Sequence, residues 1–452
     1  MKKLIVLIIL ISIVSCNTKG QNKKETSENK QSVHTITDSD LETAVIYEAN
    51  IRQYSPEGTF NAFTKDIPQL KQLGVKIIWL MPISPISKKD RKGPLGSYYA
   101  IQDYTKVNPE YGNLEDLKKL VDTAHENGMF VILDWVANHT GRDHHWLTEH
   151  PDFYVRDDKG SPVAPFDWTD VAKLDYSNPN LRKEMISEMQ YWLKNADIDG
   201  FRCDVAAQVP VDFWEDAVKK LKQTKPVFML AEAWEPNLLV NAFDMDYGWD
   251  THHIFNKIAQ GKETVKAWDN RMKQVDTLYQ KDDILMNFVT NHDENSWNGT
   301  VKERMGDASE VMLALSYCAP GMPLIYSGQE YDIDKRLRFF DKDTIQKNKG
   351  KVWPLLEKLG KLKNTNKALN GGKKAASYTK INSSNNNQVL IFKREKEGEK
   401  LIFIANLSDK DVTFTTDLFG EFLDYLTQEK TTINKNQKLM FKPWEYKILL
   451  NK

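Results

Sequence analysis

The sequence predicts an α/β fold: a (β/α)8 TIM barrel with a short excursion after its third strand and an all-β sandwich domain at the carboxyl end. Short apolar runs alternate with stretches of helical periodicity over most of the 452 residues. Acidic residues follow three of these apolar runs. Catalytic groups in such barrels gather at the carboxyl ends of the strands, so acids from distant segments can share one site.

Eight strands and several connecting helices are expected in order. The predicted strands are residues 45–48, 75–80, 130–134, 199–204, 227–231, a region around 242–245, 284–287 and 324–326. Helical periodicity and helix-end signals occur at residues 113–127, 180–195, 211–222 and 307–318. This alternation is typical of a (β/α)8 barrel.

Two segments depart from plain alternation. Residues 141–173 contain several His, Asp and Pro residues and little periodicity, and they are too long for an ordinary strand-to-helix loop. We expect them to form a small excursion over the site. After residue 366 apolar residues alternate, with Asn and Gly turns, which indicates a β-sandwich. We therefore assign residues 41–365 to the barrel and 366–452 to a sandwich that supports it.

The acids that follow the strands are Asp204, Glu232 and Asp293. Alternate strand residues point the same way, so Arg202 and Asp204 should face the barrel interior together. The guanidinium is expected to lower the pKa of Asp204, which suits a nucleophile. Burial beside Trp234 is expected to raise the pKa of Glu232, which suits an acid. Acetal cleavage requires such a pair of carboxyls, whereas an ordinary buried ion pair is the alternative for Arg202 and Asp204.

Four short motifs carry a family resemblance. Residues 134–139 (DWVANH), 200–204 (GFRCD), 231–234 (AEAW) and 289–293 (VTNHD) resemble, in order, the signature regions of the α-amylase family, glycoside hydrolase family 13. Residues 96–104 (GSYYAIQDY) resemble the family segment after the second barrel strand. The resemblance covers about residues 46–330 and continues more loosely to the end, and the order of the motifs makes it specific.

The resemblance implies roles for seven residues. Asp204 would attack the anomeric carbon, Glu232 would protonate the glycosidic oxygen and later activate water, and Asp293 would hold the distorted sugar ring. The implied substrate-binding residues are Tyr99, His139, Arg202 and His292. Arg202 would orient Asp204, the two histidines would bind sugar hydroxyls, and Tyr99 would stack on a sugar face.

The function implied is a retaining α-glycoside hydrolase that cleaves starch, maltodextrin or related α-glucans by double displacement. An α-glucan transglycosylase of the same family would share every catalytic residue and exclude water better. A noncatalytic glycan-binding protein is the third reading, although all three acids are present. The chain has Ala207 and Gln208 where strict α-amylases usually carry Lys-His, so the resemblance supports a strict endo-acting amylase less firmly than it supports the family.

No cofactor is expected to be required, and a calcium site is doubtful. Asn138 matches a calcium ligand of the family. Two residues before Asp175, however, Lys173 stands where the common family pattern has an acid, and an ammonium cannot coordinate a cation. The Asp/Asn-rich loop of the other frequent family site is absent from residues 51–60. We therefore predict no metal-ligating residues.

The amino terminus predicts a location in the bacterial cell envelope. Met1-Lys2-Lys3 precedes an apolar run at residues 4–14, as in a secretory signal, and this run is too short to span a bilayer comfortably. Residues 13–16 resemble a bacterial lipobox, so residues 1–16 would be a lipoprotein signal that ends in lipidated Cys16. An ordinary cleavage site near an incidental cysteine is the alternative. Polar residues 17–40 are expected to form a disordered tether. The sequence does not predict which face of the membrane the enzyme occupies.

The net charge and the cysteine content give no indication of a nucleic-acid-binding or disulfide-stabilised protein. The formal net charge of −1 gives no electrostatic reason to bind nucleic acid. Besides Cys16 the chain has only Cys203 and Cys318, both in apolar segments, and we expect no disulfide. The sequence does not predict an oligomeric state.

Overall fold

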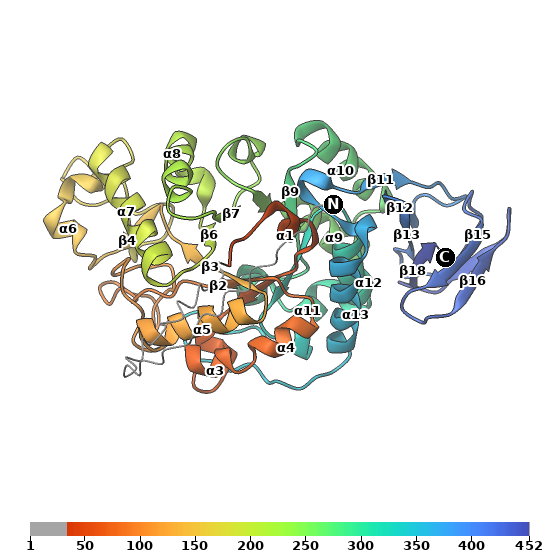
Figure 1. Ribbon diagram of the computed structural model, residues 1–452, viewed down its shortest axis with the longest axis horizontal. Coiled ribbons are helices and arrows are strands. Elements are labelled where there is room, and N and C mark those ends of the chain that lie inside the picture. Colours follow the sequence, from red (N-terminus) through yellow and green to blue (C-terminus); the bar gives the residue numbers. More distant parts are fainter. Residues whose placement is uncertain (1–33, 452) are drawn as a thin grey trace, which may run out of the picture. The chain divides into compact units, whose positions relative to one another are not determined.

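A computed structural model describes residues 34–451, and its eight parallel strands close into a barrel. The strands run around it in the order β1-β10-β9-β8-β7-β6-β3-β2. Their bounds are β1 (Ile46–Ala49), β2 (Ile77–Leu80), β3 (Phe130–Trp135), β6 (Gly200–Cys203), β7 (Phe228–Ala231), β8 (Met245–Tyr247), β9 (Ile284–Asn287) and β10 (Met322–Tyr326). The predicted (β/α)8 barrel is confirmed (Figure 1).

The sixth predicted strand was placed wrongly. The strand expected at residues 242–245 is β8, which begins only at Met245 and pairs Met245 with Leu230 of β7. Phe243 instead packs its ring on Trp214 of a barrel helix, with the ring centroids 5.3 Å apart. The Asp244 carboxylate accepts a hydrogen bond from the backbone N–H of Met229, so this stretch leads into the strand as a packed turn.

Helices surround the barrel, and the four predicted ones are confirmed to within about two residues. They are α5 (Leu114–Glu126), α7 (Pro179–Asn195), α8 (Val211–Leu221) and α12 (Ser309–Cys318). Asn113 begins α5 with a capping box, since its side chain and that of Asp116 each accept from the other's backbone N–H. Further helices are α2 (Ile51–Tyr54), α3 (Phe60–Thr64), α4 (Ile67–Gln72), α9 (Trp249–Ala259), α10 (Val265–Leu278), α11 (Val301–Met305) and α13 (Val352–Thr365).

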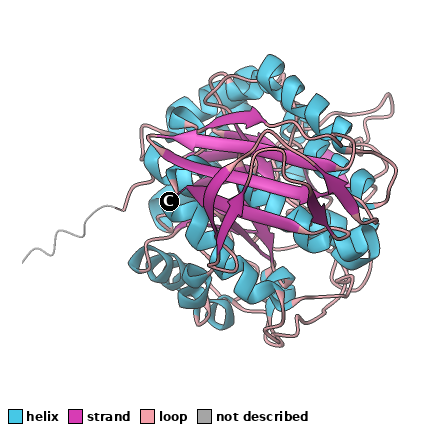
Figure 2. Ribbon diagram, turned by 90° about the vertical axis from the view of Figure 1, so that its right-hand side faces the viewer, coloured by secondary structure: helices cyan, strands magenta, loops and turns pink. Residues whose placement is uncertain are grey.

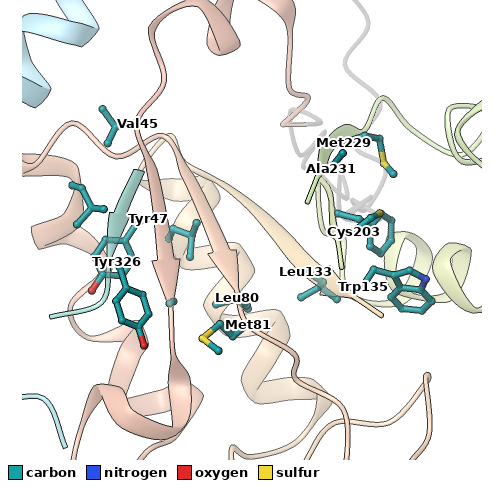
Figure 3. Close-up of a cluster of buried hydrophobic side chains, with 14 of the residues drawn as sticks. Val45, Tyr47, Leu80, Met81, Leu133, Trp135, Cys203, Met229, Ala231 and Tyr326 are labelled. Atoms are coloured by element: carbon teal, nitrogen blue, oxygen red, sulfur yellow. The ribbon is translucent and has the colours of Figure 1, made fainter. Parts of the chain in front are cut away.

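Alternation along the strands divides the core into two sides. Inward residues such as Ile77, Phe130 and Leu230 form one buried cluster, and outward residues such as Cys203 and Ala231 pack under the helices in another. Figure 3 shows part of the outer cluster on the strands. Gly200 allows β6 and β7 to approach closely, because its φ is +154° and a Cβ there would lie 1.9 Å from the carbonyl oxygen of Phe228.

The chain is ordered earlier than predicted at its amino end. α1 (Asp38–Thr43) begins inside the expected tether of residues 17–40, with a capping box between Thr37 and Asp40. Ile36 and Leu41 are buried with the barrel's inward cluster, and this apolar burial outweighs the polar composition that predicted disorder. The predicted signal, Cys16 and most of the predicted tether lie outside the described residues.

The excursion after β3 is a folded element. β4 (His139–Gly141) pairs antiparallel with β5 (Val171–Lys173) and fixes its base. α6 (Trp146–Glu149) lies between them, and the Arg142 guanidinium donates to the carbonyls of Pro162 and Thr169. These contacts hold the excursion together as one folded element.

Antiparallel sheets form the carboxyl-terminal part, as predicted. Their bounds are β11 (Ser377–Lys380), β12 (Val389–Lys396), β13 (Glu399–Asn406), β18 (Tyr446–Asn451), β15 (Gly420–Asp424) and β16 (Lys430–Ile433) in one sheet, with β14 (Val412–Phe414) and β17 (Leu439–Phe441) in a second. Figure 2 shows the strands of this part in front of the helices. One face of the larger sheet covers a core shared with the smaller sheet.

The other face of the larger sheet packs on the barrel. Leu390 and Phe403 belong to the same buried cluster as the barrel helices. Arg394 of β12 is fully buried and donates to the carbonyl of Cys318 at 3.2 Å.

Cys203 and Cys318 are both buried and form no disulfide with each other, as the sequence predicted for this pair. In residues 34–451 no helix is both long and apolar enough to cross a membrane.

Candidate active site

Six of the seven predicted site residues line one cavity at the carboxyl end of the barrel. Its volume is about 520 Å³. The six residues are Tyr99, His139, Asp204, Glu232, His292 and Asp293. They come from five different segments of the chain, so the strand ends converge as the sequence predicted.

Arg202, the seventh residue, lies buried beneath the cavity and contacts three carboxyls. Nη1 is 2.7 Å from Asp134 Oδ1 and 3.1 Å from Asp204 Oδ1, and Nη2 is 2.8 Å from Glu232 Oε2. Arg202 therefore positions both the predicted nucleophile and the predicted acid.

The predicted low pKa of Asp204 is wrong. Burial raises the pKa of Asp204 well above its ordinary value, and the neighbouring Glu232 carboxylate raises it further, although Arg202 opposes both effects. Burial also raises the pKa of Glu232, as predicted, against the effect of the same guanidinium. Because the Glu232 carboxylate is one cause of the raised pKa of Asp204, a proton on Glu232 favours ionisation of Asp204.

Asp134 and Glu48 complete a buried network that the sequence interpretation missed. Asp134 Oδ2 accepts from the Tyr99 hydroxyl at 3.1 Å. The Tyr99 hydroxyl is 2.8 Å from His292 Nε2, and His292 Nδ1 is 2.5 Å from Glu48 Oε1. Both acids stand at strand ends, so the rule that selected Asp204 would have selected them too. The network fixes the ring of Tyr99 in the cavity wall.

His292 is expected to make stability pH-dependent. Burial lowers its pKa, but Asp293 and Glu48 outweigh burial and raise the pKa to about 9. Because the folded pKa is the higher one, the stabilisation is full below the unfolded pKa of 6.5 and is lost as pH rises through about 9. The loss should be on the order of 3 kcal/mol. Denaturant unfolding from pH 6 to 10 should show a steeper decline for the wild type than for His292→Gln, and equal declines would contradict this.

His139 stays neutral and is held by its neighbours. Burial lowers the pKa of His139 to about 3. The Asn138 amide lies 3.2 Å from His139 Nδ1, and Trp168 packs edge-on against the ring. Lys173 pairs with His139 across the two-stranded sheet.

Within the described part of the chain, no group of three or more His, Cys, Asp or Glu side chains could hold a metal ion.

Val205, directly after Asp204, has an unusual backbone conformation. Its φ is +37°, in the left-handed region that a β-branched residue rarely adopts. Its N–H donates to Glu232 Oε2 at 2.8 Å. Strain of this kind persists where the surroundings impose it, and here it aims a donor at the predicted acid.

Aromatic side chains form one rim of the cavity and were also missed. Asp293 precedes a π-helical turn, Glu294–Asn298, which is an uncommon conformation that often occurs at functional sites. The turn presents Trp297 to the cavity. The Trp297 ring is 5.1 Å from Phe339 and 5.9 Å from Phe340. No local pattern distinguishes these three residues from ordinary core aromatics.

A second groove of about 330 Å³ adjoins the cavity and shares Trp168, Val205 and Glu232 with it. It is lined further by Phe166, Trp234 and Trp249. Phe166 and Trp234 are 62% and 57% exposed, which is unusual for large apolar side chains. The groove therefore offers apolar faces on the Glu232 side of the cavity.

A closed barrel that gathers three carboxyls in a cavity at its carboxyl end defines a barrel enzyme with the groups that glycoside hydrolysis needs. The alpha-amylase catalytic-domain model matches residues 23–171 and 165–367, well over half of the chain. The chain belongs to the alpha-amylase family and is a glycoside hydrolase.

Two solved structures agree with the chain in fold and length, whereas the chain spans less than half of one curated relative. An alpha-amylase from Lactobacillus plantarum is 33% identical, with 92% of this chain and 100% of that chain covered and a TM-score of 0.83. A maltogenic alpha-amylase, AmyB, from Thermotoga neapolitana is 30% identical, with 90% and 98% covered and a TM-score of 0.83. "Alpha-amylase MalA" from Haloarcula japonica is 27% identical over 64% of this chain, which spans only 44% of that protein. Other relatives are named cyclomaltodextrinase, maltogenic alpha-amylase and 4-alpha-glucanotransferase.

Proposed function

We propose that the protein is a retaining hydrolase of α-glucosidic bonds in starch, maltodextrin or related α-glucans, with Asp204 as nucleophile, Glu232 as acid and base, and Asp293 as stabiliser of the distorted ring. The observation that carries the proposal is the convergence of these three carboxyls on one cavity, with Arg202 contacting both Asp204 and Glu232. A noncatalytic glycan-binding protein would have no need for this buried charge cluster, which is costly to maintain.

The mechanism requires one of the two carboxyls to be ionised while the other is protonated. The reactive state has Asp204 ionised and Glu232 protonated. Asp204 attacks the anomeric carbon while Glu232 gives its proton to the leaving oxygen, and a glycosyl ester forms. Glu232, now ionised, takes a proton from water, which breaks the ester and restores both groups. Arg202 stays between the two carboxyls, so it can stabilise whichever carries the charge at each step.

The anomer released first tests the mechanism. Two inversions at the anomeric carbon return the starting configuration, so an α-glucan should give an α-configured sugar before mutarotation. Proton NMR during early turnover measures this directly. The β-anomer as first product would require abandoning Asp204 as nucleophile.

Transfer to a sugar acceptor is the second candidate function. The groove lined by Phe166, Trp234 and Trp249 lies on the Glu232 side, where an acceptor would enter, and aromatic faces suit sugar rings. A relative named 4-alpha-glucanotransferase is 28% identical over 60% of this chain. Product sizes with and without an added acceptor saccharide distinguish the two activities, because only transfer yields chains longer than the donor.

We also propose that the enzyme is held at the bacterial cell envelope by lipid on Cys16, with an α-glucan as its partner. The lipobox-like residues 13–16 support this. Cys16→Ala is expected to move activity from the membrane fraction to the soluble fraction, since acyl chains supply the membrane affinity. Activity that stays in the membrane fraction after this substitution would place the anchor elsewhere.

A further inference from the structure

An ion pair joins two loops at the wall of the catalytic cavity. Lys92, in the loop after β2, lies with its Nζ 3.3 Å from Oδ1 of Asp170, in the excursion after β3. Both residues line the catalytic cavity. The Asp170 side chain is 4% exposed and that of Lys92 is 38% exposed. Within residues 34–451 the Asp170 carboxylate forms no other hydrogen bond or ion pair, so Lys92 alone compensates its buried charge.

The loop that carries Lys92 is firmly packed. The backbone N–H of Leu95 donates to the carbonyl of Phe340 at 3.0 Å, and Arg52 donates to the carbonyl of Gly96 at 3.3 Å. Gly93 has a φ of +64°, and a Cβ there would lie 2.5 Å from the Phe340 Cβ. Lys92 is therefore presented from a fixed wall.

The opposite wall is fixed as well. Asp170 immediately precedes β5, which is paired with β4 at the base of the excursion. Neither partner can withdraw far without breaking backbone contacts. The Lys92–Asp170 pair thus spans two walls that hold their positions.

The position of the pair indicates which part of a substrate meets it. The leaving group must lie on the Glu232 side, because Glu232 gives it a proton, and the aromatic groove with Trp234 continues the cavity there. Lys92 and Asp170 line the cavity but not this groove. They therefore face the glycone, meaning the sugar units that stay attached to Asp204.

We propose that the Lys92–Asp170 pair limits the length of glycone that the cavity accepts, which makes these two residues determinants of specificity. The inference rests on the proposed function and adds the substrate's chain length to it. A longer glycone must separate the ammonium from the carboxylate, and a buried carboxylate without a partner is strongly unfavourable. Shorter glycones leave the pair intact and do not incur this cost.

The test varies only the glycone, using 4-nitrophenyl α-maltooligosides of increasing length and following release of nitrophenol. For the wild type, kcat/KM should stop rising at a short glycone. In Lys92→Met, which keeps the apolar stem and removes the charge, kcat/KM should keep rising, so that the ratio of long to short substrates increases about tenfold. Lys89→Met removes a charge from the same loop at an exposed residue outside the cavity lining, and it should match the wild type.

Asp170→Asn serves as the second variant, because the amide removes the buried charge without leaving it unpaired, and it should shift the ratio in the same direction. Thermal melting identifies a variant that fails to fold. Folded variants that keep the wild-type ratio, or lower it, would overturn the length limit while the proposed hydrolysis stands. If the wild type cleaved no bond of any of these substrates, giving neither nitrophenol nor shorter saccharides, both the proposed function and the length limit would be overturned.

Discussion

Replacing Asp204 with Asn is expected to lower kcat by on the order of 10⁴-fold or more. The amide cannot form the glycosyl ester, so the double displacement is lost at its first step. Stability should not fall with activity. Burial and the Glu232 carboxylate both raise the pKa of Asp204, which means that its charged form opposes folding. The neutral amide removes that cost.

Two measurements check this result together. Hydrolysis of an α-glucan gives the loss of turnover, and thermal melting near pH 7 should give a midpoint no lower than that of the wild type. Asp212→Asn is a matched control, since Asp212 lies on the surface and pairs with Arg182. It should leave turnover unchanged. A folded Asp204→Asn enzyme with near-normal activity would exclude Asp204 as the nucleophile.

Replacing Arg202 with Met is expected to have the largest effect on stability, lowering the free energy of unfolding by about 3–5 kcal/mol. The guanidinium is fully buried and contacts Asp134, Asp204 and Glu232, and its Nε donates to the Tyr247 hydroxyl at 3.1 Å. Without it Asp134, Asp204 and Glu232 each lose the ion pair that Arg202 forms with them. They must take up protons or draw in water, and both changes oppose folding.

Denaturant unfolding of purified protein measures this change. Arg336→Met is the control, because it removes the same group from the exposed pair with Glu303, and it should cost about 1 kcal/mol or less. The loss in Arg202→Met should shrink as pH falls and the carboxyls become protonated. A loss of stability equal to that of the control would mean that the buried carboxyls do not depend on Arg202.

Sequence reasoning succeeded where the information lies in contiguous residues. Strands such as β3 and helices such as α5 follow from periodicity and capping, and Asp204 and Glu232 each stand directly after an apolar run. Alternation correctly predicted that Arg202 turns inward and Cys203 outward. It failed at β8, where Phe243 and Asp244 are held by side-chain contacts with other segments.

By itself, the sequence determined the barrel, the order of its motifs and the three acids at its strand ends, because each is encoded within a few neighbouring residues. Only the tertiary structure decided that Arg202 contacts both Asp204 and Glu232, that Glu48 binds His292, and that Lys92 meets Asp170. It also reversed the expected pKa shift of Asp204, because burial and charge are sums over every segment that surrounds a group, and residues far apart in the chain supply most of that sum.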